Sequence, residues 1–150
     1  MAQKAHNHLA NGNAHELTVK TLEDQISSSL IYNRITGNSY TAAMYIGLIS
    51  LLDNTAADLV GKRIGFFSYG SGSVGEFFTG TLVDGYQDML HKLRHQNMLA
   101  ARQALNYADY QKMYAFEVPT DGGDHKFEHQ TNGKFRLTGI SQHKRLYQVQ

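Results

Sequence analysis

The feature that most constrains the fold is a segment that is apolar around its whole circumference. Residues 39–53 have a helical pattern in which almost every position from Ala42 to Leu52 is apolar, with Ser50 as the interruption. A helix without a polar face must be surrounded by other protein or by lipid. A membrane span needs about 20 apolar residues, so the sequence predicts no membrane-spanning segment. We therefore expect this helix to lie buried in a larger fold, with Ser39 or Thr41 capping its start.

The rest of the chain alternates between helical and strand patterns. Apolar spacing predicts further helices over residues 1–10, 18–35 and 86–116, the last of them broken near Asn106. Strands are predicted over residues 62–68 and 76–83, which form a hairpin around a glycine-rich stretch, and as an antiparallel pair within residues 134–149. The first helix has no N-cap residue before it, whereas Gly37 is the usual residue to end the second. These patterns predict an α/β fold with a β-hairpin, flanking helices and a C-terminal strand pair.

Composition excludes several kinds of protein. The 150 residues carry 14 Lys and Arg against 13 Asp and Glu, a formal net charge of +1, so we expect no nucleic-acid partner. The absence of cysteine rules out disulfides, cysteine-ligated zinc and a thiol nucleophile within this chain. The first residues lack the apolar centre of a signal peptide. We therefore expect a cytoplasmic protein with no membrane partner.

Residues 70–75 read Gly-Ser-Gly-Ser-Val-Gly and match the G-x-G-x-x-G pattern of dinucleotide-binding proteins. That function requires a helix to begin inside the motif, so that its N-terminus faces a pyrophosphate. Residues 77–79 (Phe-Phe-Thr) are typical of a strand instead. Two interpretations remain, namely a flexible hairpin loop or a backbone that passes close to a ligand and directs N–H groups at it. The serine-nucleophile pattern G-x-S-x-G fails around Ser71, because Tyr69 and Ser73 occupy its glycine positions.

Polar side chains at two further places could carry chemistry. Asn38 stands just before the apolar helix, where it is either a cap or turn residue or an amide that holds a carbonyl oxygen in a cavity. His91 and His95 lie four residues apart on a predicted helix, and His125 and His129 lie in a polar loop. No third ligand stands in a matching frame. We expect no metal site and interpret His91 and His95 as part of a solvated helix face.

Two segments together resemble a known enzyme family. Residues 37–43 read GNSYTAA, and residues 61–77 read GKRIGFFSYGSGSVGEF. Both closely resemble the C-terminal part of 3-hydroxy-3-methylglutaryl-CoA (HMG-CoA) synthase, with the bacterial form of the mevalonate pathway as the nearest match. The resemblance is clear from Met1 to about Tyr86 and continues more loosely to the end of the chain. It implies that residues 1–150 form the later part of the second half of a thiolase-like layered fold.

The resemblance also implies an acyltransferase reaction. The family condenses acetyl-CoA with acetoacetyl-CoA to give HMG-CoA and CoA, and needs no cofactor besides these substrates. An acetyl group is loaded on a cysteine, a glutamate removes a methyl proton, and the carbanion attacks the ketone of acetoacetyl-CoA. Hydrolysis then releases the product. Because the family is dimeric, a homodimer is expected for the complete enzyme.

By the same resemblance, several residues correspond to family positions near the substrates. Asn38 matches the asparagine that, with a histidine, holds the acetoacetyl carbonyl oxygen. Ser71 matches the serine whose backbone N–H helps bind the thioester oxygen of the acyl-cysteine. Lys4 matches the second of two lysines that contact CoA. The expected substrate-binding and CoA-binding positions are Lys4, Asn38, Tyr40, Tyr69, Gly70 and Ser71, and the expected catalytic positions among them are Asn38 and Ser71.

The departures from the family pattern limit what this chain is expected to do. The family's cysteine, glutamate and histidine match no position of this chain, and the resemblance places all three before Met1. Met1 is therefore expected to be an internal methionine, in agreement with the uncapped first helix. We expect the isolated chain to be inactive, and either to aggregate or to assemble with the missing N-terminal part of the enzyme. The alternative is a non-catalytic remnant or interaction domain that keeps the fold without the chemistry.

Overall fold

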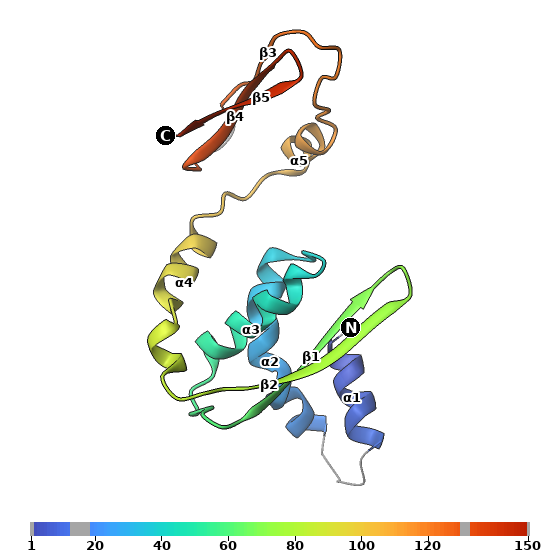
Figure 1. The fold of residues 1–150 in the computed structure, drawn as a ribbon, viewed down its shortest axis with the longest axis vertical. Helices are drawn as coiled ribbons and strands as arrows, with labels where there is room; N and C mark the ends of the chain where they lie inside the picture. The colour runs from blue at the N-terminus through green and yellow to red at the C-terminus, as the bar shows by residue number, and fades with distance from the viewer. Residues whose placement is uncertain (1, 13–18, 130–132, 150) are drawn as a thin grey trace. The chain divides into compact units, whose positions relative to one another are not determined.

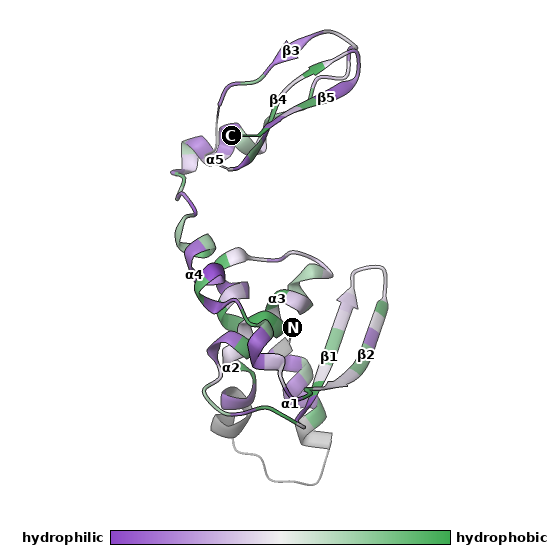
Figure 2. Ribbon diagram, turned by 60° about the vertical axis from the view of Figure 1, so that its left-hand side comes forward, coloured by the Kyte–Doolittle hydropathy of each residue, from purple (hydrophilic) through white to green (hydrophobic). Residues whose placement is uncertain are grey.

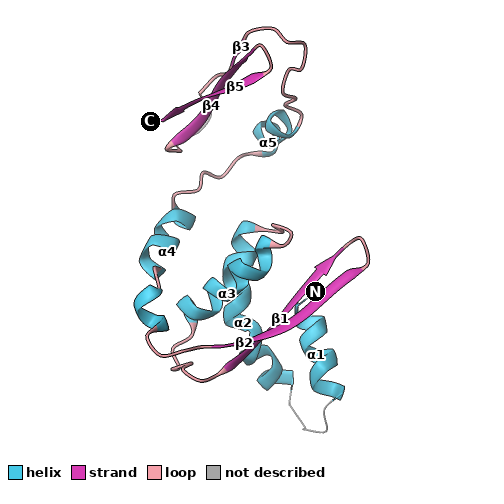
Figure 3. Ribbon diagram, viewed as in Figure 1, coloured by secondary structure: helices cyan, strands magenta, loops and turns pink. Residues whose placement is uncertain are grey.

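The computed structural model describes residues 2–12, 19–129 and 133–149 of the chain. The chain divides into two compact units, residues 1–102 and residues 103–150. Figure 1 shows the order of the elements, and Figure 3 shows that helices and antiparallel strands are mixed, as the sequence predicts. Among the described residues, no helix combines the length and the apolar character that a membrane crossing requires.

Three helices build most of the first unit. They are α1 (Ala2–Gly12), α2 (Val19–Thr36) and α3 (Ala42–Asn54). α2 and α3 pack side by side in opposite directions, since Asn33 Nδ2 near the end of α2 donates to the Ala43 carbonyl at the start of α3 over 3.0 Å. The predicted helices over residues 1–10, 18–35 and 39–53 are confirmed within a few residues, although residue 18 lies outside the described residues.

The ends of α2 and α3 differ in how well the sequence predicts them. Gly37 ends α2 as expected, with a φ of +80° and an N–H that donates to the Asn33 carbonyl over 2.9 Å. The predicted cap of α3 is wrong. Thr41 has helical dihedral angles (φ −57°, ψ −33°) and its side chain makes no capping hydrogen bond. The carbonyls of residues 39–41, including that of Ser39, instead accept hydrogen bonds from the N–H groups of residues 42–44, which satisfies the first turn.

The predicted hairpin is present in the first unit. It consists of β1 (Arg63–Gly70) and β2 (Val74–Thr81), which pair antiparallel along their whole length. The rings of Phe66 and Phe78 stack on one face, with centroids 4.8 Å apart. Phe67 and Phe77 pair on the opposite face and remain 42% and 55% exposed. The hairpin therefore has apolar rings on both faces, and one of these faces is open.

The predicted helix over residues 86–116 is broken more often than expected. A 3₁₀ turn (η1, Tyr86–Met89) and α4 (Lys92–Ala100) belong to the first unit, and α5 (Tyr107–Tyr114) belongs to the second. The break near Asn106 is confirmed, because the Asn106 side chain caps α5 by accepting the Asp109 N–H over 2.9 Å. The additional break before α4 was not predicted.

A small antiparallel sheet forms the rest of the second unit. Its strands are β3 (His125–Lys126), β4 (Phe135–Ser141) and β5 (Lys144–Val149), in the order β3–β4–β5. The predicted C-terminal pair is β4 with β5. The sequence pattern missed β3 because two residues are too few to show the alternation typical of a strand. Residues 142 and 143 in the tight turn between β4 and β5 have φ values of 46° and 68°.

Few apolar side chains are buried within the chain. Tyr32 and Ile140 are the buried members of the core among the described residues. Along α3, which Figure 2 shows to be strongly hydrophobic, Tyr45 is 54% exposed. Ile49, on the same helix, is 37% exposed. The burial expected for α3 is therefore incomplete within this chain.

Candidate functional site

The loop between α2 and α3 holds Asn38 in a defined orientation. Tyr40 has a φ of +52°, a left-handed conformation that is uncommon for a residue other than glycine. The Tyr40 N–H donates to Oδ1 of the Asn38 side chain over 2.9 Å. Both side chains are exposed. Asn38 is thus a turn residue, as one interpretation of the sequence proposed, but its Nδ2 group makes no hydrogen bond within the described part of the chain.

The turn between β1 and β2 contains Ser71. Gly70 is the last residue of β1 and pairs with Val74, so that Ser71 lies in a short exposed loop. Ser73 has a φ of +63°, as expected for the last residue of a three-residue hairpin loop. A Cβ atom added to Gly72 would meet nothing within 4 Å. The backbone at this turn is therefore accessible to another molecule.

The two loops come from different elements but lie at the same end of the first unit. Figures 1 and 2 both show the α2–α3 connection and the β1–β2 turn at this end. It carries Asn38, Tyr40, Tyr69, Gly70 and Ser71. No hydrogen bond or ion pair between the two loops occurs among the residues that the structure describes.

Lys4 lies in α1, whose first turn packs beside the C-terminal half of α2. The neighbouring Gln3 lines a shallow cavity of about 240 Å³ together with Leu30 and Arg34 of α2. Farther along α1, the His6 ring nitrogen Nε2 lies 2.8 Å from Oε1 of Gln25. α1 therefore runs opposite to α2, and Lys4 is exposed on the part of α1 that lies nearer the Asn38 loop.

The glycine-rich motif does not have the geometry of a dinucleotide site. Residues 74–81 form strand β2, so no helix begins at the motif to face a pyrophosphate. The rejection of that function from the sequence is confirmed. Among the described residues, no three His, Asp or Glu side chains come together as metal ligands.

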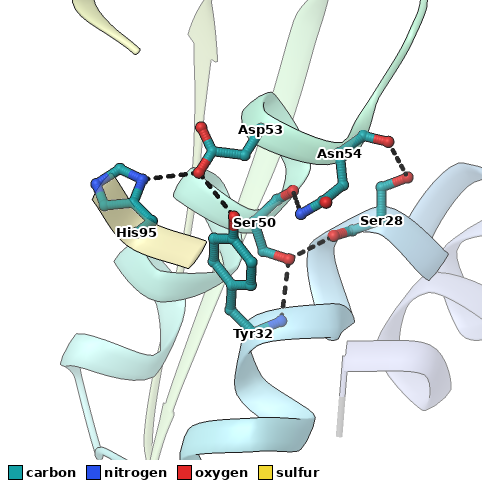
Figure 4. A network of polar contacts seen from close by, with 6 residues as sticks. All are labelled: Ser28, Tyr32, Ser50, Asp53, Asn54 and His95. Carbon is teal, nitrogen blue, oxygen red and sulfur yellow. Dashed lines mark hydrogen bonds and ion pairs between the residues drawn. The ribbon is translucent and has the colours of Figure 1, made fainter. Parts of the chain in front are cut away.

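Sequence reasoning missed a buried polar network that joins α2, α3 and α4. We call it the Asp53 network, and Figure 4 shows its six members, Ser28, Tyr32, Ser50, Asp53, Asn54 and His95. Asp53 Oδ2 accepts a hydrogen bond from the Tyr32 hydroxyl over 2.9 Å and lies 2.7 Å from Nδ1 of His95. The Asp53 side chain is fully buried, and that of His95 is 24% exposed. Because a carboxylate only accepts, Nδ1 carries the proton in this contact.

The other half of the network ties the backbones of α2 and α3 together. The Ser50 hydroxyl donates to the Ser28 carbonyl over 2.5 Å and accepts the Tyr32 N–H over 3.2 Å. Asn54 Nδ2 donates to the Ser50 backbone carbonyl over 2.8 Å. The backbone carbonyl of Asn54 accepts from the Ser28 hydroxyl. Ser50 and Asp53, three residues apart on an otherwise apolar helix, are the sequence feature that could have revealed this buried polar face.

The network corrects the interpretation of the α4 histidines. His91 is exposed, as expected for a solvated helix face, but His95 turns inward to Asp53. The two rings meet edge to face with centroids 6.4 Å apart. Burial, together with the hydrogen bond to Asp53 and the charge of that carboxylate, raises the pKa of Tyr32 above its usual value of 10.0. These contacts join α2, α3 and α4.

Comparisons with known proteins point to one family. The family model described as "Hydroxymethylglutaryl-coenzyme A synthase C terminal" matches residues 3–149. The hydroxymethylglutaryl-CoA synthase of Enterococcus faecalis is 52% identical over 93 residues, which are 62% of this chain and 24% of that protein. The synthase of Saccharomyces cerevisiae is 34% identical over 136 residues, which are 85% of this chain and 27% of that protein. The chain thus spans about a quarter of the length of these curated relatives.

A solved structure extends this similarity to three dimensions. The structure of an HMG-CoA synthase complexed with CoA matches this chain with a TM-score of 0.80 and 33% sequence identity. The match covers 98% of this chain and 39% of the solved one. Both described units therefore have counterparts in a single larger protein.

Proposed function

This chain belongs to the hydroxymethylglutaryl-CoA synthase family, and we propose that it forms the C-terminal part of an enzyme that condenses acetyl-CoA with acetoacetyl-CoA. The observation that carries this proposal is the match of residues 3–149 to the C-terminal region of the family. Family membership confirms the resemblance predicted from residues 37–43 and 61–77, together with the thiolase-like fold. The products would be HMG-CoA and CoA, as in the mevalonate pathway.

The proposed reaction has three steps. Acetyl-CoA transfers its acetyl group to a cysteine thiolate and releases CoA. A base then takes a proton from the acetyl methyl group, and the carbanion bonds to the ketone carbon of acetoacetyl-CoA, whose oxygen takes the electron pair and then a proton. Water finally cleaves the thioester to the enzyme and frees HMG-CoA. The cysteine must come from outside this chain, which has none.

Asn38 has the chemistry for the second step. Its Nδ2 group is exposed and has no partner within the described residues, so it is available to donate to the ketone oxygen as negative charge develops there. A neutral amide donates a hydrogen bond to this oxygen and does not transfer its proton to it. We propose that Asn38 stabilises this oxygen in the transition state.

The other predicted residues have supporting roles in the proposal. Ser71 would donate its backbone N–H to the thioester oxygen, which the open turn around Gly72 supports. Lys4 is exposed and would contact a CoA phosphate as a point charge. Tyr40, Tyr69 and Gly70 would line the same substrate region. We also propose that the complete enzyme is a cytoplasmic homodimer that needs no cofactor besides its two acyl-CoA substrates.

A chimeric enzyme provides the direct test. This chain is joined to the N-terminal part of the Enterococcus faecalis synthase in place of the matching C-terminal segment, and we call the product the reconstituted synthase. We expect it to release CoA from acetyl-CoA and acetoacetyl-CoA, whereas the isolated chain releases none above background. Asn38→Ala should lower kcat by roughly 10²-fold to 10³-fold, while acetyl loading of the cysteine persists because that step precedes the ketone chemistry.

Two outcomes would overturn the proposal. A reconstituted synthase that loads acetyl groups but never forms HMG-CoA would instead favour a non-catalytic remnant or interaction domain. An unchanged kcat in Asn38→Ala would remove Asn38 from the mechanism.

A further inference from the structure

The Asn38 amide has two chemically opposite ends, and the structure determines which end is free. A backbone N–H can be met only by an acceptor, so the 2.9 Å contact with Tyr40 N identifies the nearer Asn38 atom as the oxygen Oδ1. The donor group Nδ2 therefore points away from the Tyr40 backbone. Without this bond, the terminal amide could turn over, because its torsion has two broad minima of similar energy.

The left-handed conformation of Tyr40 links this contact to the start of α3. Its φ of +52° sets the direction in which the chain continues from the N–H that Asn38 accepts. Because α2 and α3 hold both ends of the loop, a different φ at Tyr40 would have to be compensated in residues 37–39, and the N–H would shift relative to Asn38. The Tyr40 ring does not hold this backbone conformation in place, since Tyr40 is 87% exposed. Backbone contacts hold it instead. The Tyr40 carbonyl accepts the Ala43 N–H over 3.0 Å, and the Ala43 carbonyl accepts from Asn33 Nδ2. The conformation is thus tied to both α3 and α2.

We propose that the backbone of Tyr40 is the positioning element for Asn38, and that it fixes the amide so that its NH₂ group faces the ketone oxygen of acetoacetyl-CoA. This inference rests on the proposed function and adds a residue that acts through Asn38. A turned amide would present its oxygen to the ketone oxygen, and the two would repel each other as charge develops. The Tyr40 N–H therefore decides whether Asn38 stabilises or opposes the transition state.

A pair of substitutions at position 40 tests the inference in the reconstituted synthase. Tyr40→Gly and Tyr40→Val both remove the ring, but glycine adopts a positive φ readily whereas a β-branched residue does so with strain. We expect the kcat of Tyr40→Val to lie about tenfold to a hundredfold below that of Tyr40→Gly. The Asn38 amide would still be present in Tyr40→Val, but it would be less well oriented, so only part of its stabilisation of the oxyanion is lost. KM for acetoacetyl-CoA should change alike in both variants.

A double-mutant cycle separates positioning from a structural role. In the Asn38→Ala background the difference in kcat between Tyr40→Gly and Tyr40→Val should vanish, because there is no amide left to orient. Acetyl loading of the cysteine reports on folding in every variant. If Tyr40→Val does not fold, Tyr40→Asn and Tyr40→Ala form the milder pair, with asparagine the more tolerant of the left-handed conformation.

The results distinguish the two proposals. Equal kcat values within the pair, or a difference that persists without the Asn38 amide, would overturn the positioning role and leave the proposed function intact. A reconstituted synthase that is inactive with Tyr40 and Asn38 both unchanged would overturn the proposed function itself.

Discussion

Asp53 places an ionisable side chain in the interior of the first unit. Its carboxylate is fully buried, and Oδ2 receives both the Tyr32 hydroxyl and the His95 ring. Oδ1 makes no hydrogen bond within the described part of the chain. Because a buried carboxylate that loses a partner keeps its desolvation cost, the two donors are worth more here than on a surface.

The His95 contact should therefore stabilise the docking of α4. We expect His95→Ala to lower the free energy of opening of α4 by about 1–3 kcal/mol, since Asp53 would lose one of its two donors. Hydrogen exchange at the α4 amides measures this opening in the reconstituted synthase. His91→Ala is the matched control, because His91 is exposed one turn earlier, and it should change the opening by less than about 0.5 kcal/mol. Equal effects of the two substitutions would contradict the role of the Asp53 contact.

Because of Tyr32, the stability of the folded chain should depend on pH in the alkaline range. Its pKa is raised in the folded protein by burial and by Asp53, from a usual value of 10.0. As the pH rises above 10.0, the unfolded chain loses the tyrosine proton first and binds fewer protons than the folded one. Stability must then fall with increasing pH until the folded pKa is passed. Thermal unfolding across this range should show the decline, and Tyr32→Phe should make it shallower; an identical slope would show that Tyr32 does not contribute.

The sequence predicted most of the elements because their periodicity is local. The hairpin, α2 and the final strand pair follow from spacing and from turn residues such as Gly37. The break before α4 was missed, and so was the strand β3, which depends on tertiary pairing with β4 rather than on a repeated pattern. The inward turn of His95 was also missed, since its partner lies 42 residues earlier in the chain. For the candidate site, the resemblance supplied Asn38 and Ser71, while the orientation of the Asn38 amide required coordinates.

Pairing of β3 with β4 depends on a glycine. A Cβ atom at Gly139 would collide with the His125 carbonyl across the strands. We expect Gly139→Ala to destabilise the second unit by about 1–3 kcal/mol, because overpacked backbone has to move. Gly75→Ala in β2 is the control, since its Cβ would lie 3.8 Å from the Phe67 ring, an ordinary contact. Faster hydrogen exchange at Phe127 N–H, which bonds to the Thr138 carbonyl, would report the loss; unchanged exchange would contradict it.

At the scale of the whole chain, the uncovered apolar surface is the dominant property. Large apolar side chains are exposed on α3, where Tyr45 is 54% exposed, and on the open face of the hairpin, where Phe67 and Phe77 are 42% and 55% exposed. Contiguous exposed apolar patches are typical of surfaces that another protein segment covers. This property supports the proposal that the chain assembles with an N-terminal part of a synthase.

One substitution on the open hairpin face separates aggregation from assembly. Phe77 is 55% exposed in this chain. We expect Phe77→Lys to increase the soluble fraction of the isolated chain and to abolish the CoA release of the reconstituted synthase, because a charge would be buried in the assembled enzyme. Gln87→Lys, at an exposed polar position of η1, should change neither measurement. Full activity with Phe77→Lys would show that this face stays open.

The contact between Asp53 and His95 has a consequence for the history of the family. A change at position 53 to an apolar residue would leave His95 Nδ1 without its acceptor, and a change at position 95 alone would leave a buried carboxylate with one donor fewer. Each single substitution therefore costs more stability than the substitution of both residues together. Across related synthases, the two positions should therefore covary, and independent variation at either site in an alignment would indicate that the network is peculiar to this chain.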